Sequence, residues 1–299
     1  MNALLLTISI TMNLISYGIV RNEFCKKEVK SNSDLNAFNA VSSLVSMAAL
    51  TVICAVTSAL SVPSMYTVLL GIVFGLSTAF CAILNMKALE SGPLSYTNVI
   101  VSCAMVIPAL SGMALYKETV SPWQIAGIVL MVTSFVCAVD NKNRSSGASL
   151  RWLLFCLGAF LFSGAVGVMQ KVHQNSIHKN ELGIFLIIAF GVSALFSCCL
   201  TVYYKKAANE SITVLSKGKT CKFVAYSIVC GIGIALCNQI NMYLAGTMDS
   251  IILYPVLNGA SMILTAAAGI LLWRERLSAK QWFGLVMGGI AILLLCNIF

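Results

Sequence analysis

Amide, phenol and ammonium side chains lie inside otherwise apolar stretches of this 299-residue sequence, and their chemistry suits the binding of a polar solute. Polar groups inside a bilayer are costly and usually face a bundle interior or a wet cavity. There they can replace the hydration shell of a solute with hydrogen bonds. The candidate substrate-binding residues are Asn13, Tyr17, Asn85, Lys87, Tyr96, Asn98, Lys171, Asn238, Asn241, Tyr254 and Asn258.

The spacing of some candidates places them together on one helix face. Asn238 and Asn241 are three residues apart, and Tyr254 and Asn258 are four apart, so each pair shares a face. We expect both pairs to face a cavity. The alternative is that such residues bond across helices as packing contacts, each contributing about 0.6–2 kcal/mol. For any single asparagine both interpretations stay open.

Charged side chains are scarce inside the apolar stretches. No Asp or Glu lies in the middle of one; Glu90 and Asp249 are at ends. A proton-coupled exporter of lipophilic cations needs such a carboxylate, so this class is disfavoured. Lys87 and Lys171 lie near the ends of their stretches, where they either extend to the interface or point inward and pair with a substrate carboxylate or phosphate.

The composition requires that membrane helices position these residues. Apolar residues make up 59% of the chain and charged residues 10%, and the mean hydropathy is +0.91, which excludes a soluble protein. A spanning helix needs about 20 mostly apolar residues. We predict an all-α membrane protein with ten spans, at 2–20, 37–60, 66–89, 94–116, 122–139, 150–170, 182–204, 222–245, 250–273 and 280–298.

The net charge of +9 comes from basic residues scattered between the apolar stretches, so no nucleic-acid partner is expected. With ten spans, sixteen of the nineteen Lys and Arg residues lie on the side opposite the termini, and three lie on the side of the termini. Because basic loops stay in the cytoplasm, both termini are predicted outside. The two sides are called the basic side and the terminal side below.

An internal repeat divides the chain. Shifting the sequence by 157 residues (275 minus 118) places Glu118 on Glu275, and Ser121, Gln124 and Gly127 on Ser278, Gln281 and Gly284. We therefore predict two five-helix repeats, at 1–141 and 150–299, joined by a polar linker at 142–149. Because five is odd, the second repeat must enter the membrane from the opposite side, which is the inverted arrangement of many transporters.

Two five-span repeats with the corners Lys117-Glu-Thr-Val-Ser121 and Arg274-Glu-Arg-Leu-Ser278 resemble the EamA-type transporters of the drug/metabolite transporter superfamily. The segment Lys87–Ser95 is similar to that family's junction between its third and fourth helices. The resemblance implies a ten-helix bundle with a central cavity and the export or exchange of small metabolites, with amino acids or similar zwitterions as the expected class. The orientation departs from the resemblance, because many such members have both termini in the cytoplasm.

Other functional classes are disfavoured. The cysteines form no CxxC pair and lie mostly in apolar stretches, so neither a metal site nor a disulfide is expected. His173 and His178 do not form an HExxH motif, and Gly218-Lys219-Thr220 lacks the first glycine of a phosphate-binding loop. We expect no enzyme activity, no catalytic residue, no cofactor and no metal.

The sequence thus predicts a secondary transporter, an exporter or facilitator in the cell membrane, that moves a small polar metabolite by alternating access. A sugar or nucleotide-sugar carrier is the alternative within transport, and a membrane scaffold or regulatory subunit is the alternative outside it. The expected partners are the substrate and the lipid bilayer. The close-packing pairs Gly71/Gly75 and Gly284/Gly288 indicate packing within the bundle, while a homodimer through the last helix stays open.

Overall fold

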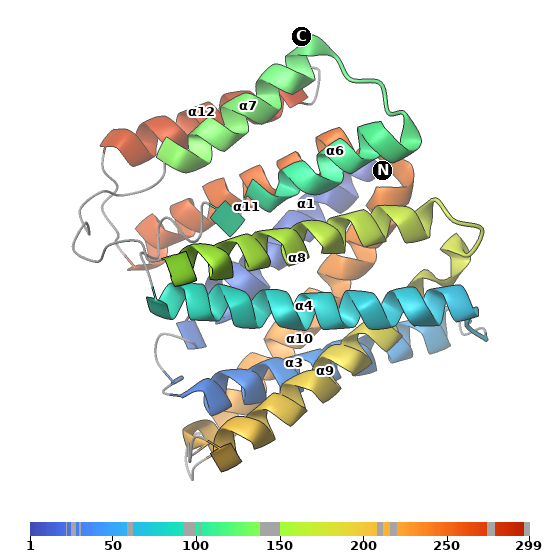
Figure 1. The fold of residues 1–299 in the computed structure, drawn as a ribbon, viewed down its shortest axis with the longest axis vertical. Helices are drawn as coiled ribbons and strands as arrows, with labels where there is room; N and C mark the ends of the chain where they lie inside the picture. Colours follow the sequence, from blue (N-terminus) through green and yellow to red (C-terminus); the bar gives the residue numbers. More distant parts are fainter. Residues whose placement is uncertain are drawn as a thin grey trace. The chain divides into compact units, whose positions relative to one another are not determined.

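A computed structural model of the chain describes residues 1–21, 23–24, 28–29, 31–58, 62–91, 100–101, 103–137, 150–207, 212–215, 220–273 and 279–295 (Figure 1). Within these residues the chain is helical and contains no strand. The longer elements are α1 (Asn2–Asn13), the π-helix η1 (Leu14–Arg21), α3 (Asn32–Val56), α4 (Met65–Ser91), α6 (Val106–Tyr116), α7 (Pro122–Cys137), α8 (Leu150–Gln174), α9 (Leu182–Ala207), α10 (Thr220–Thr247), α11 (Ser250–Trp273) and α12 (Ala279–Leu295).

Every predicted apolar stretch overlaps a helix. In the described residues, six helices are long and apolar enough to cross a membrane, at Asn2–Arg21, Asn32–Val56, Met65–Asn85, Leu150–Gln174, Lys179–Ala207 and Thr220–Thr247. Shorter apolar helices lie at Cys103–Tyr116, Pro122–Ser134 and Trp282–Leu295. The all-α membrane class is therefore confirmed, while the layout of ten spans in two repeats stays a prediction.

Serine side chains fix where several helices begin. The hydroxyl of Ser31 accepts a hydrogen bond from the backbone N–H of Asp34 at the start of α3. At α7, Ser121 and Gln124 form a reciprocal capping box, with backbone-to-side-chain distances of 3.0 and 3.2 Å. In the repeat, Ser121 and Gln124 correspond to Ser278, which lies outside the described residues, and to Gln281, the third residue of α12.

The contacts group the described helices into two compact units. Unit 1 comprises Met1, Ala3–Ala79 and His173–Tyr243, and unit 2 comprises Asn2, Phe80–Val172 and Leu244–Phe299. Each unit contains residues from both predicted repeats. This grouping by contact does not test the domain boundaries 1–141 and 150–299, which remain a prediction.

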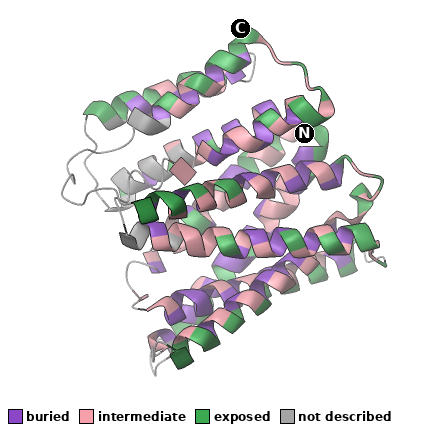
Figure 2. Ribbon diagram, viewed as in Figure 1, coloured by how far each residue is buried: buried purple, intermediate pink, exposed green. Residues whose placement is uncertain are grey.

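In unit 1, α3 and α9 pack side by side, and α4 packs on α9 (Figure 1). A Cβ atom added to Gly71 would lie 3.2 Å from the carbonyl oxygen of Phe185, and one added to Gly75 would collide with the carbonyl oxygen of Ala189. These two glycines therefore allow α4 to approach the α9 backbone closely, as their spacing predicted. In Figure 2 the buried positions, in purple, recur along α3, which packs against α9.

In unit 2, α7 and α12 pack together with reciprocal contacts (Figure 1). A Cβ atom on Gly127 would lie 3.2 Å from the carbonyl oxygen of Ala291, and the hydroxyl of Ser134 donates to the carbonyl oxygen of Gly284 at 2.6 Å. Gly127 is the repeat equivalent of Gly284, and Ser134 is the equivalent of Ala291. The two helices are therefore antiparallel and meet at matching positions.

Candidate functional site

A polar network joins α1 to α10 inside unit 1. The hydroxyl of Ser9 donates a short hydrogen bond to the Oδ1 of Asn241 and lies 3.4 Å from the sulfur of Cys237. That sulfur accepts bonds from the Nδ2 of Asn241 at 3.5 Å and from the Nδ2 of Asn13 at 3.9 Å. Because the Ser9 proton is directed to Asn241, the Cys237 thiol is the donor to Ser9, and the bonds form a closed ring.

Helical spacing produces this network. Ser9 and Asn13 are four residues apart on α1, as are Cys237 and Asn241 on α10, so each pair lies on one helix face. The π-helix η1 begins directly after Asn13. Because π-helical turns inside helices occur frequently at functional sites, the junction of α1 and η1 is a candidate binding position.

Tyr17 lies within η1, and its ring is exposed in the structure. The guanidinium of Arg21, one turn further along, is 5.5 Å from the centre of that ring. The structure thus gives this predicted site residue a cationic neighbour on its own helix.

A second polar network, in unit 2, surrounds Lys171. Its Nζ lies 2.7 Å from Oε1 of Glu118 and donates to the carbonyl oxygen of Met248 at 2.8 Å. The other carboxylate oxygen of Glu118 accepts the backbone N–H of Ser250, at the start of α11, at 2.8 Å. The side chains of Lys171 and Glu118 are only 7% and 6% exposed, so the ion pair is almost fully removed from the surface.

The local backbone sets the position of Glu118. Lys117 ends α6 in the left-handed conformation, with a φ of 52°, which turns the chain sharply after the helix. Gly112 provides room for the carboxylate, because a Cβ atom there would collide with Glu118 and lie 2.8 Å from the Cβ of Ser250. The predicted acidic corner is therefore an anchor for α11.

Two predicted site residues of α11 make contacts within unit 2. The hydroxyl of Tyr254 donates to the carbonyl oxygen of Gly167 on α8 at 2.6 Å, and its side chain is buried. The amide of Asn258 donates to the carbonyl oxygen of Tyr254, and the residue is exposed. Tyr254 thus joins two helices, whereas Asn258 bonds within its own helix.

The remaining predicted residues are distributed along other elements. Asn238 donates to the carbonyl oxygen of Ile234 on its own helix, unlike its neighbour Asn241. Asn85 is half-buried, and its buried Oδ1 has no partner among the described atoms. Lys87 lies 5.9 Å from the ring centre of Phe155. Tyr96 and Asn98 lie outside the described residues.

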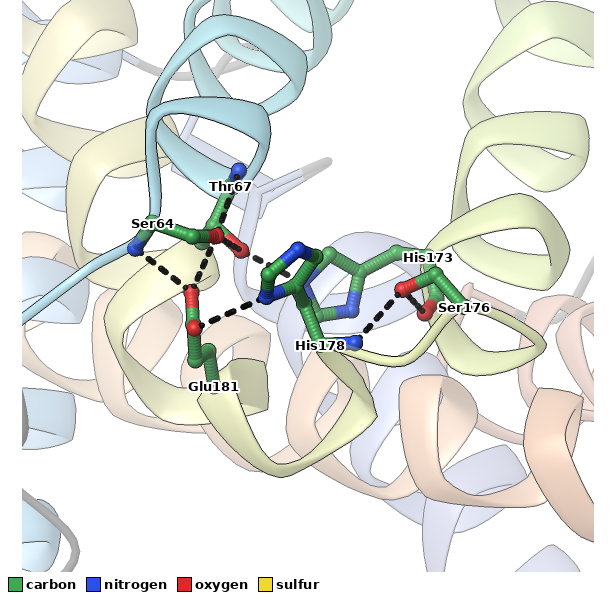
Figure 3. Close-up of polar contacts among 6 residues, drawn as sticks. All are labelled: Ser64, Thr67, His173, Ser176, His178 and Glu181. Carbon is green, nitrogen blue, oxygen red and sulfur yellow. Dashed lines mark hydrogen bonds and ion pairs between the residues drawn. The ribbon is translucent and has the colours of Figure 1, made fainter.

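A third cluster connects the start of α4 to the segment between α8 and α9 (Figure 3). Glu181 accepts the backbone N–H of Ser64 at 2.9 Å and the Ser64 hydroxyl at 2.8 Å, and its other oxygen lies 3.2 Å from Nδ1 of His178. His173 is fully buried, with Nε2 3.3 Å from the hydroxyl of Thr67. Because α8 continues to Gln174, His173 lies in the last turn of this helix.

Several of these polar residues are not apparent from the sequence. Ser9 and Cys237 resemble ordinary small residues of apolar stretches, and only their spacing relative to Asn13 and Asn241 could have indicated the network. Asp34 is also buried, near the start of α3, and accepts the backbone N–H of Thr213 at 2.7 Å. Sequence alone does not show which distant segment supplies such a partner.

Comparison with known proteins finds a family likeness over part of the chain. Residues 8–139 match the EamA-like transporter family, which confirms the resemblance inferred from the sequence. A Haemophilus influenzae protein described as uncharacterized is 20% identical over 217 residues, which cover 70% of this chain and 69% of that protein. A solved crystal structure whose description names no function aligns with 99% of this chain and 96% of its own, with 14% identity and a TM-score of 0.77. That likeness supports the fold alone.

Proposed function

Starting from the match of residues 8–139 to the EamA-like transporter family, we propose that this membrane protein is a secondary transporter of a small polar metabolite. The observation that carries the proposal is the polar network of α1 and α10. Its hydrogen-bonding groups lie in two helices that are long and apolar enough to cross a membrane. Polar residues at such positions usually face a bundle interior or a substrate pathway.

The predicted inverted repeat favours transport by alternating access. Antiparallel packing of α7 on α12 at matching positions is what two oppositely inserted repeats require of their last helices. We propose that the repeats alternate in opening the substrate site to the two sides of the membrane.

A zwitterion such as an amino acid is the proposed substrate class. Its ammonium and carboxylate groups can bond to amide oxygens and N–H groups of the kind that Asn13 and Asn241 supply. The sugar-phosphate alternative needs a cation directed at the phosphate. The ion pair between Lys171 and Glu118 gives one of the two candidate lysines a carboxylate partner within the chain, which favours the zwitterion.

We propose that the protein resides in the cell membrane with the basic side in the cytoplasm. The structure supports the assignment of the connections to two sides. Ser64, before α4, meets Glu181, before α9, and both connections belong to the predicted terminal side. Asp34 and Thr213 meet near the other end of α3, and the connections beside them belong to the basic side.

Solute counterflow in proteoliposomes tests the proposed function. Vesicles loaded with an unlabelled amino acid should transiently accumulate the same labelled amino acid, and vesicles without the protein should not. A panel of amino acids, sugars and nucleotide sugars identifies the class. A scaffold or regulatory subunit predicts no counterflow with any member, and counterflow restricted to sugars or nucleotide sugars would contradict the zwitterion proposal.

A second measurement tests whether the substrate binds at the network of α1 and α10. Cys237 is a native thiol within it, so a substrate found by counterflow should slow the alkylation of Cys237 in detergent-solubilised protein. Cys156 is equally buried but lies in unit 2 beside Trp152 and provides the control. Equal protection of both cysteines would indicate general tightening of the protein and contradict a local site.

A further inference from the structure

Contacts between α3 and α10 in unit 1 recur in one register. The rings of Phe38 and Phe223 are 6.4 Å apart, and the hydroxyl of Ser46 donates to the carbonyl oxygen of Gly231 at 2.7 Å. The sequence separation is 185 residues in both pairs (223 minus 38 and 231 minus 46), so the two helices run in the same direction. Because the two contacts are about two helical turns apart, one further step lies between them.

Ser42 and Ser227 occupy this middle step, since 227 minus 42 is also 185. Both residues are almost fully buried, and neither hydroxyl has a hydrogen-bond partner among the described atoms. A buried hydroxyl without a partner is unfavourable. Helix packing therefore explains the step at Ser46, whose hydroxyl is bonded, but it does not explain two facing hydroxyls one turn earlier.

Polar groups continue along α10 toward the network of α1 and α10. The thiol of Cys230 donates to the carbonyl oxygen of Ser16 on η1 at 3.6 Å. The Ser16 hydroxyl is also buried without a partner among the described atoms, and it lies against Gly233, where a Cβ atom would collide with it. From Ser227 to Cys237 of the network, such groups extend over about 15 Å of helix. This polar track comprises Ser42, Ser227, Ser16, Cys230 and Cys237.

An aromatic cluster covers the end of the polar track at which α10 begins. The ring of Phe24 stacks on Phe38 at 4.4 Å between centres, and it lies 6.0 Å from the ring of Phe223 and 5.5 Å from that of Tyr226. The three phenylalanines are only 1–2% exposed, although the exposed Cys221 lies two residues before Phe223. These rings offer a polar solute no hydrogen bond comparable to those of the track. They therefore separate the track from the nearby surface.

We propose that the aromatic cluster is a gate: its rings separate in the state that admits solute from the side of Cys221, and the polar track then leads the solute to the network of α1 and α10. Hydroxyl groups both donate and accept hydrogen bonds, so the free hydroxyls of the track can replace part of the solute's hydration. Apolar packing accounts for the rings but not for the buried hydroxyls behind them. The gate rests on the proposed transport function, because a scaffold needs no route to the network.

Alkylation of native cysteines in membrane vesicles tests the gate. A membrane-impermeant maleimide is added to right-side-out and to inside-out vesicles, and labelling of each cysteine is read by mass spectrometry. Cys221 marks the side of the gate, and Cys230 reports access to the track. In Phe38→Ala we expect labelling of Cys230 from the side of Cys221 to rise by about tenfold or more. A tenfold change in an opening equilibrium needs only about 1.4 kcal/mol, less than a buried Phe→Ala change usually costs.

The matched control is Phe74→Ala. Phe74 is also 1% exposed and packs on the ring of Phe185 at 5.2 Å, but it lies on α4 against α9, so its loss should leave Cys230 labelling unchanged. Phe38→Leu replaces Phe38→Ala if the latter does not fold, and a smaller rise from the same side is expected.

Three results would overturn the gate: no rise in a folded Phe38 variant, an equal rise from both sides, or an equal rise in Phe74→Ala. Labelling requires no substrate, so failure of the gate is distinct from failure of the proposed transport, which counterflow detects.

Discussion

At the residue scale, two glutamates that lie outside the α-helices each hold the start of an α-helix from a distant part of the chain. Glu118 holds the N–H of Ser250 at α11, and Glu181 holds the N–H of Ser64 at α4. The sequence indicated the acidic corner at Glu118 through the repeat, yet it did not indicate its partner. Lys171 was predicted either at the interface or facing substrate, and the structure shows it paired with Glu118. Pairings across more than fifty residues depend on packing that no local pattern reports.

The buried pair makes a stability prediction. Replacing Glu118 with Gln leaves the Lys171 charge buried without its carboxylate, so we expect a loss of about 3–5 kcal/mol in the free energy of unfolding. Lys171→Met should cost a similar amount, and the double variant should lose less than the sum of the two. Chemical unfolding of the purified protein in detergent micelles measures this. Losses below about 1 kcal/mol in both single variants would show that the pair behaves as an exposed one.

At the element scale, glycine and serine determine how closely the helices approach. The spacing of Gly71 and Gly75 predicted close packing, and the structure confirms it against α9. The repeat also predicted that positions 127 and 284 correspond, and both lie where α7 meets α12. Local patterns therefore indicated which helix faces pack closely. They did not indicate the π-helical turn at Leu14–Arg21, because π-helices have no such repeating pattern of apolar residues.

The close approach of α4 to α9 can be tested by one methyl group. Gly75→Ala would place a Cβ atom against the carbonyl oxygen of Ala189 and 3.0 Å from the Cβ of Val192, so we expect a loss of about 1–3 kcal/mol by overpacking. The control is Gly289→Ala on α12, where no described atom lies within 4 Å of the new methyl group. Thermal unfolding in detergent compares the two variants. Equal stability would contradict the contact at Gly75.

At the scale of the whole molecule, composition alone predicted a helical membrane protein, and the structure confirms this class. The membrane class can be predicted from the sequence because an apolar stretch of sufficient length has few alternatives to a spanning helix. The repeat boundaries and the orientation cannot be predicted with the same certainty from composition, since they depend on how the two halves of the chain insert into the membrane. Both stay predictions. The contacts of Ser64 with Glu181 and of Asp34 with Thr213 show only that connections predicted to share a side of the membrane lie together.

Orientation is predicted from the loop charges. Ile177, 91% exposed in the α8–α9 connection, should lie outside, and Cys221, exposed at the start of α10, should lie in the cytoplasm. A membrane-impermeant maleimide on intact cells should label a chain whose sole cysteine comes from Ile177→Cys. A chain retaining only Cys221 should react after permeabilisation alone. The reverse pattern of labelling would place the termini in the cytoplasm.

The most direct test of the central claim compares substitutions of two polar residues, one in α10 and one in α1. Asn241→Leu removes an amide that bonds both Ser9 and Cys237, whereas Thr11→Val removes an exposed hydroxyl that bonds only its own helix, at the carbonyl oxygen of Thr7. In amino-acid counterflow we predict that Asn241→Leu lowers the initial rate by about fivefold to tenfold, since one substrate hydrogen bond is lost, and that Thr11→Val matches the unmodified protein. Equal rates in both variants, with both folded and reconstituted in equal amounts, would contradict a substrate site at α1 and α10.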